Sequence, residues 1–430
     1  MYKKVKMLSV LALLMFLATV LLAGCGSSKS GESGESGSDK DVTISALFMK
    51  QAGYSEDDVR NMTKEFESNN PGIKVNLTFL AYEALHDKII TNVASGTNSF
   101  DVVPVDDPWL AEFAQAGIIK DISAQVTAEM KEEVFPAAME TFAFQGKQYA
   151  IPWNNDTKFF FYNKKMLADA GFEKAPATWE EFVTMAKAIK DKGIAESPSI
   201  WSWSQAEALV CDYQTFLSAF GGRMLDDDLN PVFNEKPGVD ALQFMVDLQK
   251  DGLANASSTQ SLEEDVRRVF SQGKVAFATN WTYMYNLAKD PNESTVTEDV
   301  GIALMPDKKS VYGAMGLAMS STTKNDEAVW KFIEYLTSKE VQKKYAALSL
   351  PIWKTLYDDP ELVEAQPELV AVAKEQYENV ESRARTPWYP ELSQALQLEI
   401  QNALTGNKDP QKALDDAATK VEEIKNSYSK

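Results

Sequence analysis

Two hydrophobic periods alternate along residues 42–105. Apolar residues at every second position predict strands over 42–48 and 73–79. Apolar residues at helical spacing predict helices over 55–70 and 82–95, and Ser55 with Asp58 forms a capping box at the start of the first. The run at 100–105 is typical of a buried strand. This order predicts an α/β fold with a doubly wound sheet, whose ligands bind beyond the carboxyl ends of the strands.

Two side chains follow the strand at 100–105 and are candidates for a ligand site by position. They are Asp106 and Trp109. A structural interpretation also exists, because Asp107 and Pro108 are suited to begin a helix over 109–116. The two interpretations are compatible if Asp106 still faces the end of the sheet.

The stretch Tyr149–Leu167 places a polar cluster between apolar runs. Pro152 excludes a helix there, and residues 154–157 are Asn, Asn, Asp and Thr. Buried polar groups need partners, so these side chains meet either water or a ligand. We interpret the stretch as a strand that crosses between two lobes, with Trp153 and Asp156 facing the gap. An ordinary buried strand with a polar turn is the alternative.

The second half of the chain shows further strand and helix patterns. Strands are predicted over 275–279, 300–304 and 311–320, a hairpin over 221–234, and helices over 178–193, 237–250, 262–272, 325–336, 338–348, 360–379, 391–404 and 410–425. The acidic hairpin does not fit a calcium loop, because Pro231 and Pro237 occupy the positions that require Gly and Glu. We therefore expect no metal there.

Several aromatic residues have an open assignment between core and cleft. Trp179 lies on a helix stripe and is expected in the core. Trp201 and Trp203 share one face of any strand and precede a helix, so either can face the cleft. Trp281 and Tyr283 follow the strand at 275–279 at period two. They are expected as an exposed aromatic platform, and a core position is the alternative.

Composition limits the function further. A chain of 430 residues is expected to form two lobes or domains. The formal net charge of −20 argues against nucleic-acid binding. His86 is the single histidine, which argues against zinc sites and histidine-based catalysis; we expect it on a solvated helix face. We expect no cofactor, and Cys211 is expected as a small buried side chain.

The N-terminus has the pattern of a secretion signal. Lys3, Lys4 and Lys6 precede an uncharged run from Met7 to Gly24, for which a single-pass membrane anchor is the alternative. The run ends in LAGC, which resembles the bacterial lipobox. We therefore expect residues 1–24 to be a signal peptide, Cys25 to be lipidated with palmitate, and residues 25–40 to be a flexible linker. The protein is then anchored to the outer face of the cell membrane.

From Val42 onward, the order and spacing of several segments resemble the maltose/trehalose-type (family 1) solute-binding lipoproteins of bacterial ABC sugar importers. The segments are VDDPWLAEFAQAG, AIPWNNDTKFFFYNKKMLADAG, PATWEEF, VAFATNWTYMY, YGAMGLAMS and RTPWYPELSQALQLEIQNALTG. The resemblance implies a periplasmic-binding-protein-like fold of type II, with two α/β lobes joined by crossing hinge segments. It implies an N-terminal lobe of 41–152 and 316–378, and a C-terminal lobe of 153–315 and 379–430.

The resemblance also implies where ligand contacts lie. It places acidic ligand residues at Asp106 and Asp156 and a late arginine at Arg385. Together with the residue patterns, it leads us to expect a site of Tyr54, Glu56, Asp106, Trp109, Trp153, Asp156, Trp201, Trp281, Tyr283, Gly313, Met315, Arg385 and Trp388. Relatives that bind maltose or trehalose commonly carry a tryptophan after paired glycines. This chain has Gly313, Ala314 and Met315 instead, which removes one aromatic plate.

These observations favour a monomeric, non-catalytic receptor that delivers a sugar or oligosaccharide to the transmembrane subunits of an ABC permease. Aromatic rings suit the apolar faces of sugar rings, and Asp, Asn and Arg suit their hydroxyls. The main alternative is a tethered glycoside hydrolase that uses Asp106 and Asp156 as its carboxylate pair. A module for a metal chelate or a peptide is a third interpretation, with little support in the composition.

Overall fold

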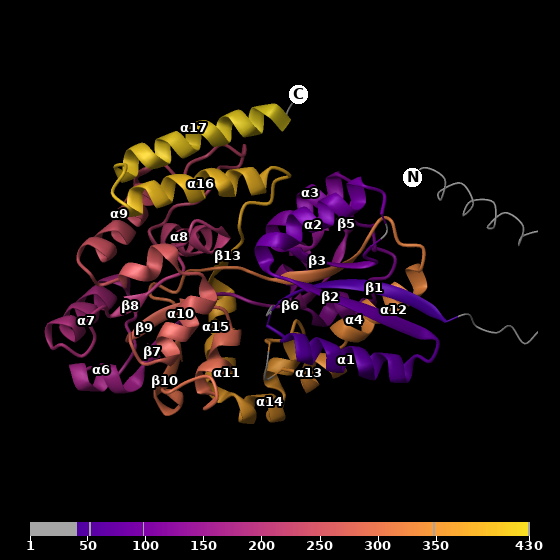
Figure 1. Cartoon of the computed structure of the whole chain (residues 1–430), viewed down its shortest axis with the longest axis horizontal. Coiled ribbons are helices and arrows are strands. Elements are labelled where there is room, and N and C mark those ends of the chain that lie inside the picture. Colours follow the sequence, from indigo (N-terminus) through magenta and orange to yellow (C-terminus); the bar gives the residue numbers. More distant parts are fainter. Residues whose placement is uncertain (1–40, 51–52, 98, 347–348, 429–430) are drawn as a thin grey trace, which may run out of the picture. The chain divides into compact units, whose positions relative to one another are not determined.

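The computed structural model describes residues 41–50, 53–97, 99–346 and 349–428. The predicted signal peptide, the lipidation site Cys25 and the linker lie outside the described residues. Residues Asp41–Lys430 form one unit, and Figure 1 labels its elements. No helix in the described part of the chain combines the length and the apolar character needed to span a membrane.

Five strands form the first sheet, in the order β2–β1–β3–β12–β6. They are β1 (Val42–Met49), β2 (Ile73–Leu80), β3 (Val102–Asp106), β6 (Ala150–Asn154) and β12 (Met315–Met319). The pairs β1–β2 and β1–β3 are parallel, as the predicted doubly wound order requires. Strand β12 is antiparallel to both β3 and β6 and sets Met315 opposite Asp106. Late residues of the chain therefore reach the carboxyl end of β3.

The helices of this part follow the predicted periodicity. Helix α1 (Glu56–Asn69) begins with the predicted capping box of Ser55 and Asp58, and it buries Val59, Met62 and Phe66. The other helices and short strands around the first sheet and between the sheets are α2 (Tyr82–Ala94), η1 (Asp107–Trp109), α3 (Leu110–Gln115), α4 (Ala128–Glu133), α5 (Pro136–Thr141), β4 (Ala143–Phe144), β5 (Lys147–Gln148), α12 (Asp326–Thr337), α13 (Lys339–Lys344), η4 (Lys354–Asp358), α14 (Pro360–Ala365), α15 (Pro367–Gln376) and η5 (Tyr377–Asn379).

Four strands form the second sheet, in the order β10–β7–β9–β8. They are β7 (Phe159–Asn163), β8 (Ser199–Ile200), β9 (Phe277–Asn280) and β10 (Val300–Ala303). Its helices are α6 (Lys164–Ala170), α7 (Trp179–Asp191), α8 (Glu207–Ala219), α9 (Lys236–Lys250), η2 (Ala256–Gln260), α10 (Glu263–Ser271), α11 (Tyr283–Lys289), η3 (Thr297–Asp299), α16 (Tyr389–Leu404) and α17 (Pro410–Tyr428). Helix α8 is buried along 208–218 and packs against α9 and α16.

The predicted crossing of Tyr149–Leu167 is confirmed, because β6 belongs to the first sheet and β7 to the second. Two further segments accompany it. Thr157 pairs with Tyr312 in an isolated bridge, and β11 (Ser310–Val311) pairs with β13 (Val380–Glu381). The predicted division of the chain between the two lobes stays a prediction.

Two local predictions need correction. The strand expected over 311–320 is two strands, because residues 312–314 leave the ladder to pass between the sheets. Trp281 and Tyr283 do not alternate along a strand, because β9 ends at Asn280 and α11 begins at Tyr283. The hairpin predicted within 221–234 is confirmed in a short form, because Leu225 and Pro231 form an antiparallel bridge and Val232 N donates to Met224 O at 3.1 Å.

The expectation of a solvated His86 is also wrong. Its side chain is 18% exposed, and Nε2 lies 2.7 Å from Oε2 of Glu112. The ring stacks on Phe113. Burial acts to lower the pKa of His86, but the hydrogen bond and charge of Glu112 outweigh it and raise the pKa overall.

Candidate functional site

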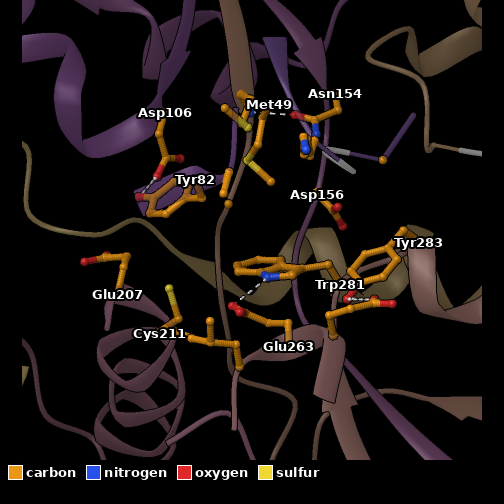
Figure 2. Close-up of a pocket in the computed structure, with 18 of the residues that line it drawn as sticks. Met49, Tyr82, Asp106, Asn154, Asp156, Glu207, Cys211, Glu263, Trp281 and Tyr283 are labelled. Atoms are coloured by element: carbon orange, nitrogen blue, oxygen red, sulfur yellow. Dashed lines mark hydrogen bonds between the residues drawn. The ribbon is translucent and has the colours of Figure 1, made fainter. Parts of the chain in front are cut away.

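A cavity of about 260 Å³ lies between the carboxyl end of the first sheet and the elements of the second (Figure 2). The first sheet and its helices contribute the loop after β1, the start of α2, and the ends of β3 and β6. The second contributes the starts of α8 and α10 and the turn after β9. Residues of the three crossing segments complete the lining. The cavity lies where the rule for doubly wound sheets places ligands.

Trp281 presents an aromatic ring to this cavity and is held on several sides. Its Nε1–H donates to Oε1 of Glu263 at 3.3 Å. The buried ammonium of Lys158 lies 5.4 Å from the ring centroid and is itself paired with Asp212 at 2.7 Å. A Cβ atom at Gly313 would come within 2.4 Å of the ring. These contacts restrain the position of the indole.

Asp156 lies on the first crossing segment and is 5% exposed. Its Oδ1 accepts hydrogen bonds from Thr157 N at 2.9 Å, Thr282 N at 3.2 Å and Thr282 Oγ1 at 2.6 Å. Within the described residues, Oδ2 accepts no hydrogen bond. Burial raises the pKa of Asp156 to about 6, and the hydrogen bonds from Thr282 and Thr157 only partly oppose this.

Asp106 is already occupied by protein donors. Arg383 Nη2 lies 2.6 Å from Oδ1, and Tyr82 Oη–H donates to Oδ2 at 2.7 Å. The other side of Arg383 donates through Nη1 to Glu207 Oε1 at 3.0 Å. Arg383 therefore links the end of β3 to the start of α8 through two carboxylates. Its side chain is 3% exposed.

The structure brings part of the predicted site together in this cavity. The residues that line it are Asp106, Asp156, Trp281, Tyr283, Gly313 and Met315. They come from four separate stretches of the chain, and Figure 2 shows Asp156, Trp281 and Tyr283 close to one another. These six predicted positions therefore share one cavity, and their role in ligand binding stays a prediction.

The other predicted positions do not line the cavity. Tyr54 and Trp153 pack on each other, with ring centroids 5.0 Å apart. Trp201 stacks on Trp203 at 5.4 Å. The remaining four are Glu56, Trp109, Arg385 and Trp388.

Each of these four has a structural partner. The ring of Trp109 stacks on that of Tyr82, with centroids 5.1 Å apart, so Trp109 contacts a residue that lines the cavity without lining it itself. Trp388 lies in the hydrophobic core formed by the second sheet and its helices. Glu56 begins α1 and pairs with Arg60, and Arg385 pairs with Asp107 at 3.1 Å.

Sequence reasoning missed several lining residues. They are Met49, Lys50, Gly53, Ala81, Tyr82, Glu83, Asn154, Glu207, Ala208, Cys211, Leu262, Glu263, Glu264 and Arg383. Tyr82 lies two residues beyond the end of β2, so the rule that selected Asp106 also points to it. Glu207 and Glu263 begin helices, and no local pattern distinguishes such acids from ordinary first-turn residues. Arg383 lies in a loop without a period, two positions from the predicted Arg385.

The chain is similar to known proteins in both sequence and fold. The family model described as "Bacterial extracellular solute-binding protein" matches residues 52–343. The chain is similar to the structure of maltose-bound MalE3 of T. maritima, with 30% identity, a TM-score of 0.83, and coverage of 89% of this chain and 99% of that one. It is also similar to an ABC transporter solute-binding protein of Agrobacterium radiobacter K84 in complex with ribitol, with 25% identity, a TM-score of 0.81, and coverage of 90% and 99%. A probable ABC transporter-binding protein of Deinococcus radiodurans is 28% identical over 329 residues, which cover 73% of this chain and 77% of that protein.

Proposed function

Because the chain belongs to the bacterial extracellular solute-binding protein family, we propose that it captures a sugar or polyol for an ABC transporter. Members of this family bind solutes and are not enzymes, so the alternative of a glycoside hydrolase is set aside. Asp106 is also a poor member of a carboxylate pair, because Arg383 and Tyr82 occupy both of its oxygens.

The observation that carries this proposal is the pairing of Trp281 with Asp156 in one cavity. An indole ring offers a surface for the apolar face of a sugar ring. The carboxylate oxygen Oδ2 of Asp156 offers a strong acceptor for a hydroxyl beside that surface. Among the predicted ligand residues, we assign direct contacts to Asp156, Trp281, Tyr283, Gly313 and Met315.

The size of the cavity favours a small ligand. Small-molecule sites commonly measure roughly 300–1,000 Å³, and this one measures about 260 Å³. A monosaccharide, a linear polyol or a short oligosaccharide is the expected occupant of this state of the pocket.

The finer parts of the proposal concern location and delivery. The sequence LAGC supports lipidation at Cys25, and the Gly- and Ser-rich residues 26–40 suit a tether that leaves the binding unit mobile. We propose that the anchored protein is a monomer, that its two lobes close on the ligand about the crossing segments, and that the permease recognises the closed form.

Titration of tryptophan fluorescence and of the melting temperature tests the proposal. The panel contains maltose, trehalose, tagatose, glucose, ribitol and mannitol, with amino acids as a comparison class. We expect a saturable change with at least one sugar or polyol. Binding of amino acids alone, or of no compound in the panel, would contradict the proposal.

A further inference from the structure

The lining of the cavity carries an excess of negative charge. Its carboxylates are Glu83, Asp106, Asp156, Glu207, Glu263 and Glu264, whereas its cations are Lys50 and Arg383. A neutral sugar brings no charge that would offset this excess. Some of these carboxylates already have a cationic partner within the protein, and others do not.

Ion pairs account for part of the excess. Arg383 bonds to Asp106 and Glu207, and Arg267 lies 2.6 Å from Glu264. Lys50 pairs with Glu56, outside the lining. Among the residues that the structure describes, no lysine, arginine or histidine lies within 4.0 Å of the carboxylates of Asp156, Glu263 or Glu83.

Asp156 supplies an observation that is independent of this count. Its side chain is 5% exposed, and protein donors reach only Oδ1. The other oxygen has no described donor, although the residue lines the cavity (Figure 2). A buried carboxylate without a cation is costly. Its free oxygen is therefore in a position to bind a charged donor from the ligand.

Glu263 and Asp156 both lie near the ring of Trp281. Glu263 accepts from the indole of Trp281, and Asp156 accepts from Thr282, the next residue in the chain. In the view of Figure 2, the two carboxylates lie on opposite sides of the Trp281 ring. A sugar stacked on Trp281 would then bring its substituents toward carboxylates that have no cation within 4.0 Å, since the ammonium of Lys158, 5.4 Å from the centroid of the ring, is paired with Asp212.

Resting on the proposed function, we propose that the pocket selects a sugar or polyol that carries a protonated primary amine. The ammonium group donates to the free oxygen of Asp156, and Glu263 contributes a second negative charge nearby. Hydrogen bonds between charged partners are stronger than those to a neutral hydroxyl. The amine therefore gains more than a hydroxyl does at the same position.

Calorimetric titration of the whole binding unit at pH 7 with matched ligand pairs tests this inference. The pairs are D-glucosamine with D-glucose, D-galactosamine with D-galactose, and the chitosan disaccharide with cellobiose. Two further compounds separate charge from shape. N-acetyl-D-glucosamine keeps the sugar ring but has no ammonium charge, and putrescine has ammonium charge but no sugar ring. In at least one pair, we expect the amine to bind roughly ten- to a hundred-fold more tightly than its neutral partner.

Two variants locate the effect. Asp156→Asn keeps the shape and the Oδ1 acceptor but removes the charge, and it should bring the ratio of the two dissociation constants close to one. The control Asp227→Asn removes a carboxylate whose side chain is 95% exposed and which is not part of the lining. It should leave the ratio unchanged.

Several results would overturn the inference. The inference would be contradicted if neutral sugars or polyols bound as tightly as the amines. It would also be contradicted if N-acetyl-D-glucosamine and D-glucosamine had equal dissociation constants. Either result would leave the proposed function standing. Tighter binding of putrescine than of every sugar would overturn the assignment to a sugar amine. Failure of every sugar and polyol to bind would overturn both proposals. An unchanged ratio in Asp156→Asn would exclude Asp156 as the recognising group.

Discussion

The carboxylate of Asp156 destabilises the folded protein when it is ionised. Burial raises its pKa to about 6, whereas an unfolded aspartate has a pKa of about 3.9. The folded state therefore binds this proton more tightly than the unfolded chain does, and stability falls as the pH rises through that interval. The loss of folding stability caused by the ionised carboxylate is absent below about pH 4 and complete above about pH 6. Such a cost is typical of residues retained for binding rather than for stability.

We predict that Asp156→Asn raises the stability of the unliganded protein at neutral pH. The variant should match the parent near pH 4 and exceed its free energy of unfolding by about 3 kcal/mol at pH 7. Urea unfolding at a series of pH values measures the difference. The exposed control Asp227→Asn should show no such trend, and a difference that does not vary with pH would contradict the prediction.

Gly313 is required by the ring that packs against it. A Cβ atom there would come within 2.4 Å of Trp281, which is closer than atoms in contact approach. We predict that Gly313→Ala displaces the indole, weakens ligand binding at least ten-fold, and costs roughly 1–3 kcal/mol of stability. Ligand titration and urea unfolding measure the two effects.

Gly222→Ala is the matched control for this substitution. A Cβ atom at Gly222 would come within 2.4 Å of Leu217, and neither residue lines the cavity. It should lower stability to a similar degree and leave the dissociation constant unchanged. Equal losses of binding in both variants would show that general destabilisation, rather than the position of Trp281, weakens the ligand.

The third crossing segment, which consists of β13 and the loop at 382–385 that follows it, is joined to the first sheet by two arginines. Arg383 bonds to Asp106, and Arg385 bonds to Asp107. Both acids follow the buried run of β3, and Arg383 also reaches Glu207 at the start of α8. One loop without regular structure therefore connects a strand of one sheet to a helix of the other. Its position depends on ion pairs rather than on backbone hydrogen bonds alone.

We predict that Arg383→Gln lowers the free energy of unfolding by roughly 3–5 kcal/mol, because it leaves Asp106 and Glu207 without their cation. The matched control is Arg268→Gln, whose side chain is 60% exposed and which should cost roughly 0–1 kcal/mol. Chemical unfolding at pH 7 compares the two. A cost below 1 kcal/mol for Arg383→Gln would show that the two ion pairs of Arg383 contribute little to the stability of the folded protein.

The described residues that line the pocket all belong to the unit Asp41–Lys430. Removal of residues 1–40 should therefore change the dissociation constant for a panel ligand by less than about two-fold, which lies within about 0.4 kcal/mol. A saturating ligand, at about one hundred times its dissociation constant, should stabilise both forms by about 2.7 kcal/mol. Loss of binding on truncation would contradict this independence.

The anchor gives a separate prediction for the full-length chain. Cys25→Ser should abolish incorporation of labelled palmitate in a bacterial host and release the protein from the membrane fraction. Ligand affinity should not change, because Cys25 lies outside the binding unit. Labelling that persists in Cys25→Ser would exclude this cysteine as the lipidation site.

Much of the architecture follows from local patterns. The periods of apolar residues predicted the first strands and helices, and the capping box at Ser55 is present as expected. The polar cluster at 154–157 predicted the crossing, because its groups cannot be buried without partners. Asp156 was identified for the same reason, whereas Asp106 was identified because it follows the strand at 100–105 at the carboxyl end of the sheet. These features depend on neighbours in the chain, which the sequence displays directly.

The remaining features depend on contacts between distant segments. Arg383 rather than Arg385 lines the cavity, because Asp106 and Glu207 meet in space at that point of the loop. Trp201 and Trp281 look equally suited to a cleft, yet Trp201 stacks on Trp203 in a core and Trp281 packs on Gly313. Periodicity assigns a side chain to one face of an element. Packing decides whether that face meets the core or the cavity, because burial depends on every segment that covers it.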